Sequence, residues 1–171
     1  MVSFWNPVDE TERPRWTVAP FVSVGPLRFG MSPDEVVAAL GGASPVRWRP
    51  GHHAEFGEVA VTAYYGDQER LMCVAVDALS GPQVTLDGTS LVGRPPSEVM
   101  DGLLRYAESR RLDHRFSQEG DVALEEAGLV MRAQRAGDVL LTRPVFVARE
   151  WAEGVGDAQL GPVPDEEWSV R

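Results

Sequence analysis

Apolar residues recur at helical spacing in the segment FGMSPDEVVAALGG, residues 29–42. Ser32 stands at its start, where a hydroxyl can accept a backbone N–H bond, and Pro33 follows at the first helical position, where its missing N–H costs nothing. Glu35 lies three residues after Ser32 and completes a capping box. Gly41 is a typical residue after a helix end. The pattern predicts a short, well-capped helix in which these residues have structural roles.

A weaker copy of this segment occurs later in the chain. The run GRPPSEVMDGL, residues 93–103, aligns without gaps on GMSPDEVVAAL, residues 30–40, with five identities in eleven positions. Each copy is followed by two β-rich runs typical of a hairpin, in residues 58–79 and 128–148. We therefore expect an α+β protein made of two tandem helix–β-hairpin units, with an antiparallel sheet and helices packed on one face.

The hairpins also predict which side chains are buried. Alternation places Leu129, Met131 and Ala133 toward the core and their neighbours toward solvent. The expected organisation is an N-terminal arm, a first unit, a second unit and an acidic C-terminal tail, over residues 1–16, 17–82, 83–149 and 150–171.

The repeated motif resembles a known fold. The matching residues are Gly30, Met31, Ser32, Val36, Leu40 and Gly41, with Gly93, Val99 and Leu103 in the second copy. This pattern resembles the tandem-repeat fold of the secreted β-lactamase inhibitor proteins and of the small outer-membrane assembly lipoproteins related to them. The resemblance covers residues 20–148 and implies a sheet surface that binds another protein. Those families are exported, whereas this chain shows no signal-peptide pattern and no lipid-attachment cysteine.

Composition narrows the class of partner. The formal net charge is −10, and all 16 basic residues are arginines, a bias typical of GC-rich bacterial genomes. The arginines form no basic stripe, so we expect no nucleic-acid binding. No apolar run approaches the roughly 20 residues of a membrane helix, so we expect no membrane contact. These features predict a cytoplasmic protein and are shared with toxin-neutralising immunity proteins.

Residues with reactive or metal-binding side chains form no recognisable constellation. Cys73 lies in an apolar run and is expected to be a buried small hydrophobe. His52 and His53 are adjacent, and adjacent side chains of a strand do not converge on one ion. With Glu55 and Glu58 nearby, a weak hard-ion site is the alternative to a plain surface loop. We expect no catalytic residue, no cofactor and no metal.

The tail offers the nearest approach to a binding site. Residues 150–171 contain six acids and one base, a net charge of −5. One interpretation is a solvated tail that aids solubility. The other is an arm in which Trp168 anchors a basic partner while Asp165, Glu166 and Glu167 steer it.

The sequence thus predicts a non-catalytic, acidic, cytoplasmic protein-binding module. Its sharpest version is an immunity-type or inhibitor protein that neutralises a basic partner. The alternative is a small-ligand-binding or accessory domain of unknown substrate. The oligomeric state stays open.

Overall fold

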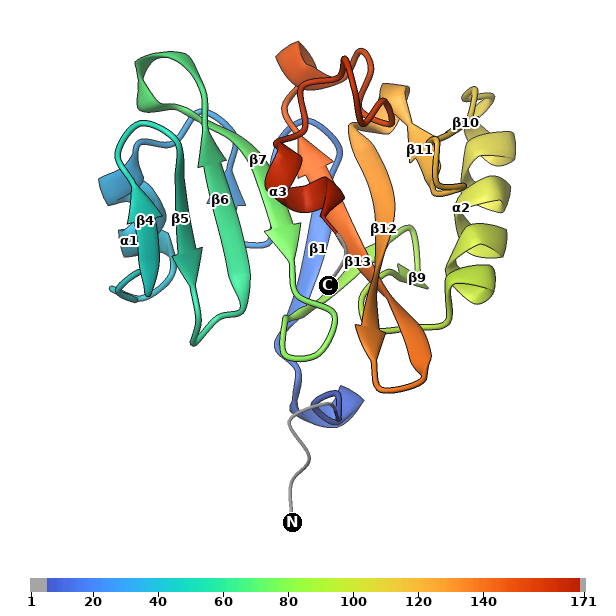
Figure 1. Cartoon of the computed structure of the whole chain (residues 1–171), viewed down its shortest axis with the longest axis horizontal. Helices are drawn as coiled ribbons and strands as arrows, with labels where there is room; N and C mark the ends of the chain where they lie inside the picture. Colours follow the sequence, from blue (N-terminus) through green and yellow to red (C-terminus); the bar gives the residue numbers. More distant parts are fainter. Residues whose placement is uncertain (1–5, 170–171) are drawn as a thin grey trace.

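The main structural feature is an antiparallel sheet of eight strands (Figure 1). The structure is a computed structural model and describes residues 6–169. In sheet order the strands are β10 (Arg115–Phe116), β11 (Val122–Leu124), β12 (Leu129–Ala136), β13 (Val139–Val147), β7 (Leu71–Val76), β6 (Val61–Tyr65), β5 (His53–Phe56) and β4 (Arg47–Arg49).

A smaller sheet of five strands packs against the large one. In sheet order it contains β3 (Leu27–Arg28), β2 (Ser23–Val24), β1 (Arg15–Ala19), β8 (Gln83–Leu86) and β9 (Thr89–Ser90). All its neighbouring strands are antiparallel except β1 and β8, which are parallel.

Three α-helices accompany the sheets in the described chain: α1 (Pro33–Ala39), α2 (Pro96–Arg110) and α3 (Asp165–Trp168). The predicted capping box of α1 is confirmed. The Ser32 hydroxyl accepts from the backbone N–H of Glu35 at 3.2 Å, and the Glu35 carboxylate accepts from the backbone N–H of Ser32 at 3.4 Å. Pro95 caps α2 without a side-chain bond. No helix in the described residues is long and apolar enough to cross a membrane.

The expected α+β class with an antiparallel sheet is confirmed, but the chain holds more strands than the sequence indicated. The four strands β4–β7 follow α1, and the four strands β10–β13 follow α2. The predicted hairpins are β6–β7 and β12–β13, and β4–β5 and β10–β11 were not foreseen. The two sets of four meet where β7 pairs with β13.

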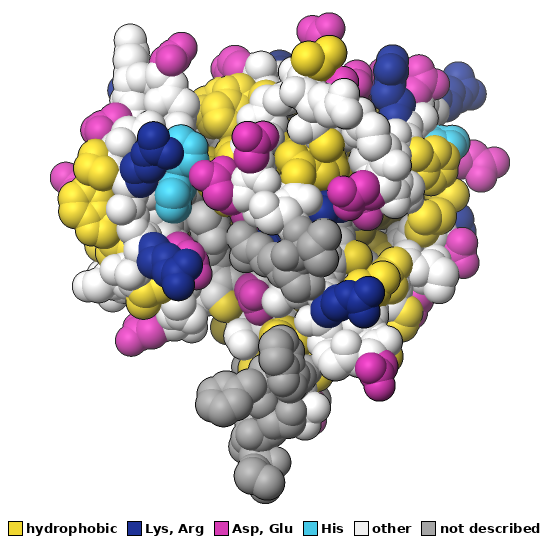
Figure 2. Space-filling model, viewed as in Figure 1, with side chains coloured by type: hydrophobic (Ala, Val, Ile, Leu, Met, Phe, Trp, Pro, Cys, Tyr) yellow, Lys and Arg dark blue, Asp and Glu magenta, His cyan; other side chains and the backbone are white. Residues whose placement is uncertain are grey.

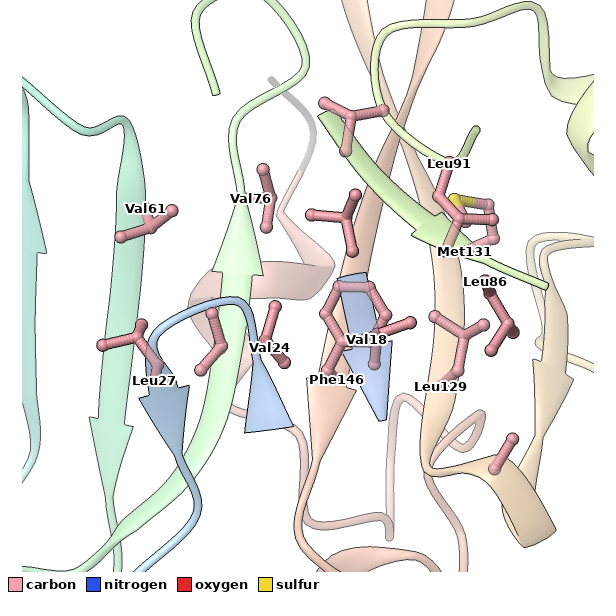
Figure 3. Packing of buried hydrophobic residues seen from close by; sticks show 14 of the residues in the cluster. Val18, Val24, Leu27, Val61, Val76, Leu86, Leu91, Leu129, Met131 and Phe146 are labelled. Atoms are coloured by element: carbon pink, nitrogen blue, oxygen red, sulfur yellow. The ribbon is translucent and has the colours of Figure 1, made fainter. Parts of the chain in front are cut away.

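One face of the large sheet, called here the core face, packs against α1, α2 and the smaller sheet. Figure 3 shows side chains of the smaller sheet, among them Val24 and Leu27, lying over those of the large sheet, among them Val76 and Phe146. All four are at most 1% exposed. Burial of these apolar side chains is the main source of stability of the fold.

The opposite face, called here the C-terminal face, is partly covered by residues 149–169, the C-terminal segment. In Figure 1, α3 crosses in front of β7 and β13. A second hydrophobic cluster forms here from strand residues Tyr64, Cys73, Ala75, Ala123, Val130, Val145 and Val147 and from segment residues Val155, Val163 and Trp168. The expectation of a solvated tail is therefore wrong, as is the expectation that all helices share one face.

This cluster also corrects the predicted orientation of β12. Val130, Arg132 and Gln134 were expected to face solvent, yet they are at most 8% exposed. The alternation itself is right, because Leu129 and Met131 do face the core. The C-terminal segment covers Val130 and Arg132, and Gln134 bonds to Asp77 and Ala78, which follow β7.

The predicted N-terminal arm belongs in part to the fold. Arg13 is 5% exposed and donates to the carbonyl oxygens of Gly81 at 2.7 Å and Ala78 at 2.8 Å. Residues 1–5 of the arm lie outside the described part of the chain.

Candidate functional site

The C-terminal face carries a buried carboxylate held by side chains of the sheet. Glu167 is fully buried in α3, and Arg143 of β13 is 1% exposed. Arg143 donates from Nη1 to one carboxylate oxygen of Glu167, and the hydroxyl of Tyr64 on β6 donates to the other. Arg143 also donates from Nη2 to the Glu167 carbonyl oxygen at 3.0 Å.

A second arginine fixes the backbone of the same helix. Arg132 donates from Nε to the Glu167 carbonyl oxygen at 3.0 Å and from Nη2 to the Trp168 carbonyl oxygen at 3.1 Å. Its guanidinium lies over the Trp168 ring, 4.8 Å from the centroid. Burial lowers the pKa of Arg132, but hydrogen bonds and charge attraction from Asp121 and Glu119 outweigh this and raise it.

These contacts explain how charged groups are tolerated inside the fold. A buried ion pair is stable only when hydrogen bonds satisfy its remaining polar atoms, and here the two arginines bond to carboxylate and backbone oxygens of one short helix. The sheet therefore determines the position of α3 and of the residues that flank Glu167.

A cavity of about 270 Å³ opens beside this ion pair. Arg143 and Glu167 contribute to its lining, together with Thr62 of β6 and with Asp77 and Ser80, which follow β7. The cavity is lined by both polar and apolar groups.

The two adjacent histidines lie on the same face, next to α3. His52 is in the turn before β5 and His53 is the first residue of the strand, so their side chains are not forced to opposite sides. Their Nδ1 atoms are 2.6 Å apart. The expectation that adjacent histidines cannot converge is therefore wrong. Burial lowers the pKa of His53, and the nearby His52 lowers it further.

The β4 edge of the large sheet is the other unusual surface. All three residues of β4 are exposed, and among the described residues β4 pairs only with β5. Trp48 is 65% exposed and Val46, just before the strand, is 63% exposed. Trp48 lies at the edge of the sheet, and its side chain is largely open to solvent.

Charge around this edge is mixed, because Glu55 lies opposite Arg47 in the register of β4 and β5, and Asp34 and Glu69 lie near Arg49. Arg47 and Arg49 flank Trp48, and within the described residues neither makes an ion pair. Figure 2 shows Arg and His side chains gathered over β4 and β5, on the left of the view. We name residues 46–49 the edge patch.

The four predicted partner-binding residues do not form one surface. Asp165 is exposed and Glu166 partly exposed, whereas Glu167 is fully buried and Trp168 is 8% exposed. Glu167 and Trp168 thus contribute to the interior and are not presented to a partner. Glu167 and Trp168 are buried because the positive charges of Arg143 and Arg132 compensate the negative charge of this helix.

The role of the arginines that hold the segment was not predicted from the sequence. Arg132 and Arg143 lie directly opposite each other in the register of β12 and β13. Both interrupt apolar strands, and a buried guanidinium requires an anion. The two arginines in apolar strands therefore indicated a buried anion, but that anion, Glu167, lies 24 residues after Arg143 in the sequence.

Cys73 is fully buried, as expected, and it lies beneath the C-terminal segment. Burial, and to a lesser extent the negative charge of Glu167, raises the pKa of its thiol well above the ordinary value. The thiol is therefore protonated and unreactive at neutral pH.

No protein-family model, curated protein or solved structure matches this chain. The resemblance to β-lactamase inhibitor proteins and assembly lipoproteins accordingly stays a prediction.

Proposed function

We propose that this chain is a non-catalytic protein-binding module that contacts its partner through the edge patch. The observation that carries the proposal is the exposed Trp48 on a sheet edge that has no neighbouring strand among the described residues. An immunity-type or inhibitor role is the specific form that we favour.

The edge offers both backbone and side-chain contacts. The side of β4 away from β5 presents N–H and C=O groups that an extended segment of another protein can pair with. Trp and Arg are the residues that most often dominate binding energy at interfaces. Trp48 and Val46 would supply the apolar contact, and the flanking arginines would fix the register.

The charge of the edge patch indicates the chemistry of the partner segment. Arg47 and Arg49 favour acidic side chains opposite them. The basic partner expected from the net charge of −10 is a competing proposal, and its support is reduced because the Glu167 carboxylate accepts from Arg143 inside the protein. We therefore commit to an extended acidic segment as the partner.

We also propose that the two sets of four strands are tandem repeats. The support is that each set follows a helix and that the last strands, β7 and β13, meet antiparallel at the middle of the sheet. A two-fold axis normal to the sheet would relate the two halves. The parallel pairing of β1 with β8 departs from that symmetry.

Photo-crosslinking tests the edge patch. A crosslinking amino acid would replace Trp48, and a control would replace Leu160, an apolar residue that is 90% exposed in the C-terminal segment. We expect position 48 to give a discrete heterologous adduct in the native host and position 160 to give none. Reversal of charge in Arg47→Glu/Arg49→Glu should abolish the adduct. Equal adducts at both positions, or no adduct at position 48, would contradict the proposal, and a stronger adduct after charge reversal would favour a basic partner.

A second candidate function is binding of a small polar ligand in the cavity beside α3. The observation in its favour is that Arg143, Asp77 and Thr62 line one space of about 270 Å³. A soaked crystal or a ligand-observed NMR screen of small polar metabolites tests it. Ligand density or saturation transfer that disappears in Thr62→Leu supports the pocket, and a lack of any binder in the screen contradicts it.

A further inference from the structure

Three metal-ligating side chains from two distant parts of the chain meet at the rim of the C-terminal face. They are His52, His53 and Glu166, and each can offer one donor atom such that all three atoms lie within 4.8 Å of one another. The Nε2 atom of His52 is 3.9 Å from Oε1 of Glu166. In sequence the histidines and the glutamate are more than one hundred residues apart, so only the docked C-terminal segment brings them together.

The position of Glu166 follows from the ion pair described above. Its neighbour Glu167 is held by Arg143 and Tyr64 inside the fold. Glu166 is therefore kept at the surface next to the histidines. The Tyr64 ring also packs near both imidazoles, with centroid separations of 6.1 Å to His52 and 5.8 Å to His53. The same tyrosine thus supports the histidines and the helix that supplies the carboxylate.

The contact between the histidines is the feature that points to a cation. The Nδ1 contact of 2.6 Å holds the two rings together, so that one nitrogen of each ring and one Glu166 oxygen lie within 4.8 Å of one another. Tetrahedral donors about 2.0–2.1 Å from zinc lie roughly 3.3 Å from one another. Small rotations of the rings and of the Glu166 carboxylate, which is 44% exposed, would reach that spacing.

We propose that His52, His53 and Glu166 bind one divalent transition-metal ion of the Zn²⁺ class. Two imidazoles and one carboxylate suit zinc, whereas Ca²⁺ and Mg²⁺ prefer oxygen donors alone. The three donors leave a fourth position for water or for a ligand from another molecule. Bound metal joins the β4–β5 hairpin to the C-terminal segment, and none of the three ligands belongs to the edge patch.

Nearby charges modulate the site. Arg49 lowers the pKa of His53 and so opposes a cation there, whereas Glu55 raises this pKa and favours a cation. Arg49 pairs with His53 across β4 and β5. The Arg49→Gln variant removes the repulsion and should tighten metal binding without changing a ligand.

Calorimetric titration of the full chain with Zn²⁺, after treatment with a chelator, tests the proposal. We expect one ion per chain, and a dissociation constant that rises at least about tenfold in His53→Asn and in Glu166→Gln. The control variant is His114→Asn, because His114 lies beyond α2 next to Phe116. The visible spectrum of Co²⁺ bound in place of zinc should show a tetrahedral site in the wild-type chain and in the His114 variant only.

Several results would overturn the inference. They are the absence of saturable Zn²⁺ binding, binding that Glu166→Gln leaves unchanged, binding that His114→Asn weakens equally, and equal competition by Ca²⁺. Circular dichroism of each metal-free variant separates loss of a ligand from loss of the fold. Glu166→Gln keeps the shape of an exposed residue and remains informative even if a histidine variant does not fold.

Discussion

Replacement of Glu167 by alanine should destabilise the protein strongly, although the residue lies near the end of the sequence, four positions before Arg171. The change removes the carboxylate to which Arg143 and Tyr64 donate. Arg143 is 1% exposed, so water cannot easily replace that oxygen. The prediction follows directly from the finding that the C-terminal segment is part of the interior.

The magnitude can be estimated from the contacts that are lost. Removal of one member of a buried ion pair costs about 3–5 kcal/mol. The Tyr64 hydroxyl loses an acceptor, which costs about 1–3 kcal/mol, but the two terms share one carboxylate and do not add fully. The bonds from both arginines to the Glu167 carbonyl oxygen survive the substitution. We expect a total loss of about 4 kcal/mol, a large part of the roughly 5–15 kcal/mol that stabilises a domain.

Urea denaturation monitored by circular dichroism measures this loss. With a slope near 2 kcal/mol per molar urea, the midpoint should fall by about 2 M. Asp165→Ala, two residues away and exposed, should stay within about 0.5 kcal/mol of wild type. The double variant Arg143→Met/Glu167→Leu should recover most of the loss, because apolar residues of similar volume can replace a buried ion pair. A Glu167→Ala variant as stable as Asp165→Ala would refute the reasoning.

Three further predictions concern single side chains. Tyr65 is buried, its hydroxyl has no hydrogen-bond partner among the described residues, and burial raises its pKa to about 12. Because the unfolded chain releases this proton near pH 10, stability should fall as pH rises above about 10. Tyr65→Phe should flatten that fall and raise stability by about 1 kcal/mol at pH 7. Urea titrations at pH 7 and above about pH 10 would show both effects, and a steeper fall in the variant would contradict the prediction. Cys73 should react with a thiol reagent in the folded chain only as fast as the protein unfolds, so rapid labelling under native conditions would disprove its burial. Ser32→Ala should cost about 1 kcal/mol through the lost cap, and an unchanged denaturation midpoint would show that the capping box contributes nothing.

Local signals in the sequence predicted the parts of the fold that depend on neighbouring residues. The α1 cap was recognised because Ser32, Pro33 and Glu35 act within one turn of helix. The hairpins β6–β7 and β12–β13 were recognised because alternation and a turn occur within one stretch. The short strands β4 and β10 were missed because two or three residues carry no alternation that can be read.

The candidate site depends on contacts that cross the chain and could not be predicted in the same way. Glu167 and Trp168 lie in a stretch rich in acids, glycine and proline, which favours solvent exposure on local grounds. Their burial depends on Arg132 and Arg143, which belong to β12 and β13. The buried apolar residues of the segment, Val155, Val163 and Trp168, are spaced too irregularly to predict a strand or helix.

Amide hydrogen exchange of the intact chain, followed by NMR, tests whether the C-terminal segment completes the fold and leaves β4 as a free edge of the large sheet. The Glu167 amide donates to the Pro164 carbonyl oxygen at 2.9 Å, beside the hydrophobic cluster of the C-terminal face. It should exchange as slowly as the amides of β7 and β13. Amides of β4 that point away from β5 should exchange quickly. Fast exchange at Glu167, together with slow exchange throughout β4, would contradict the account.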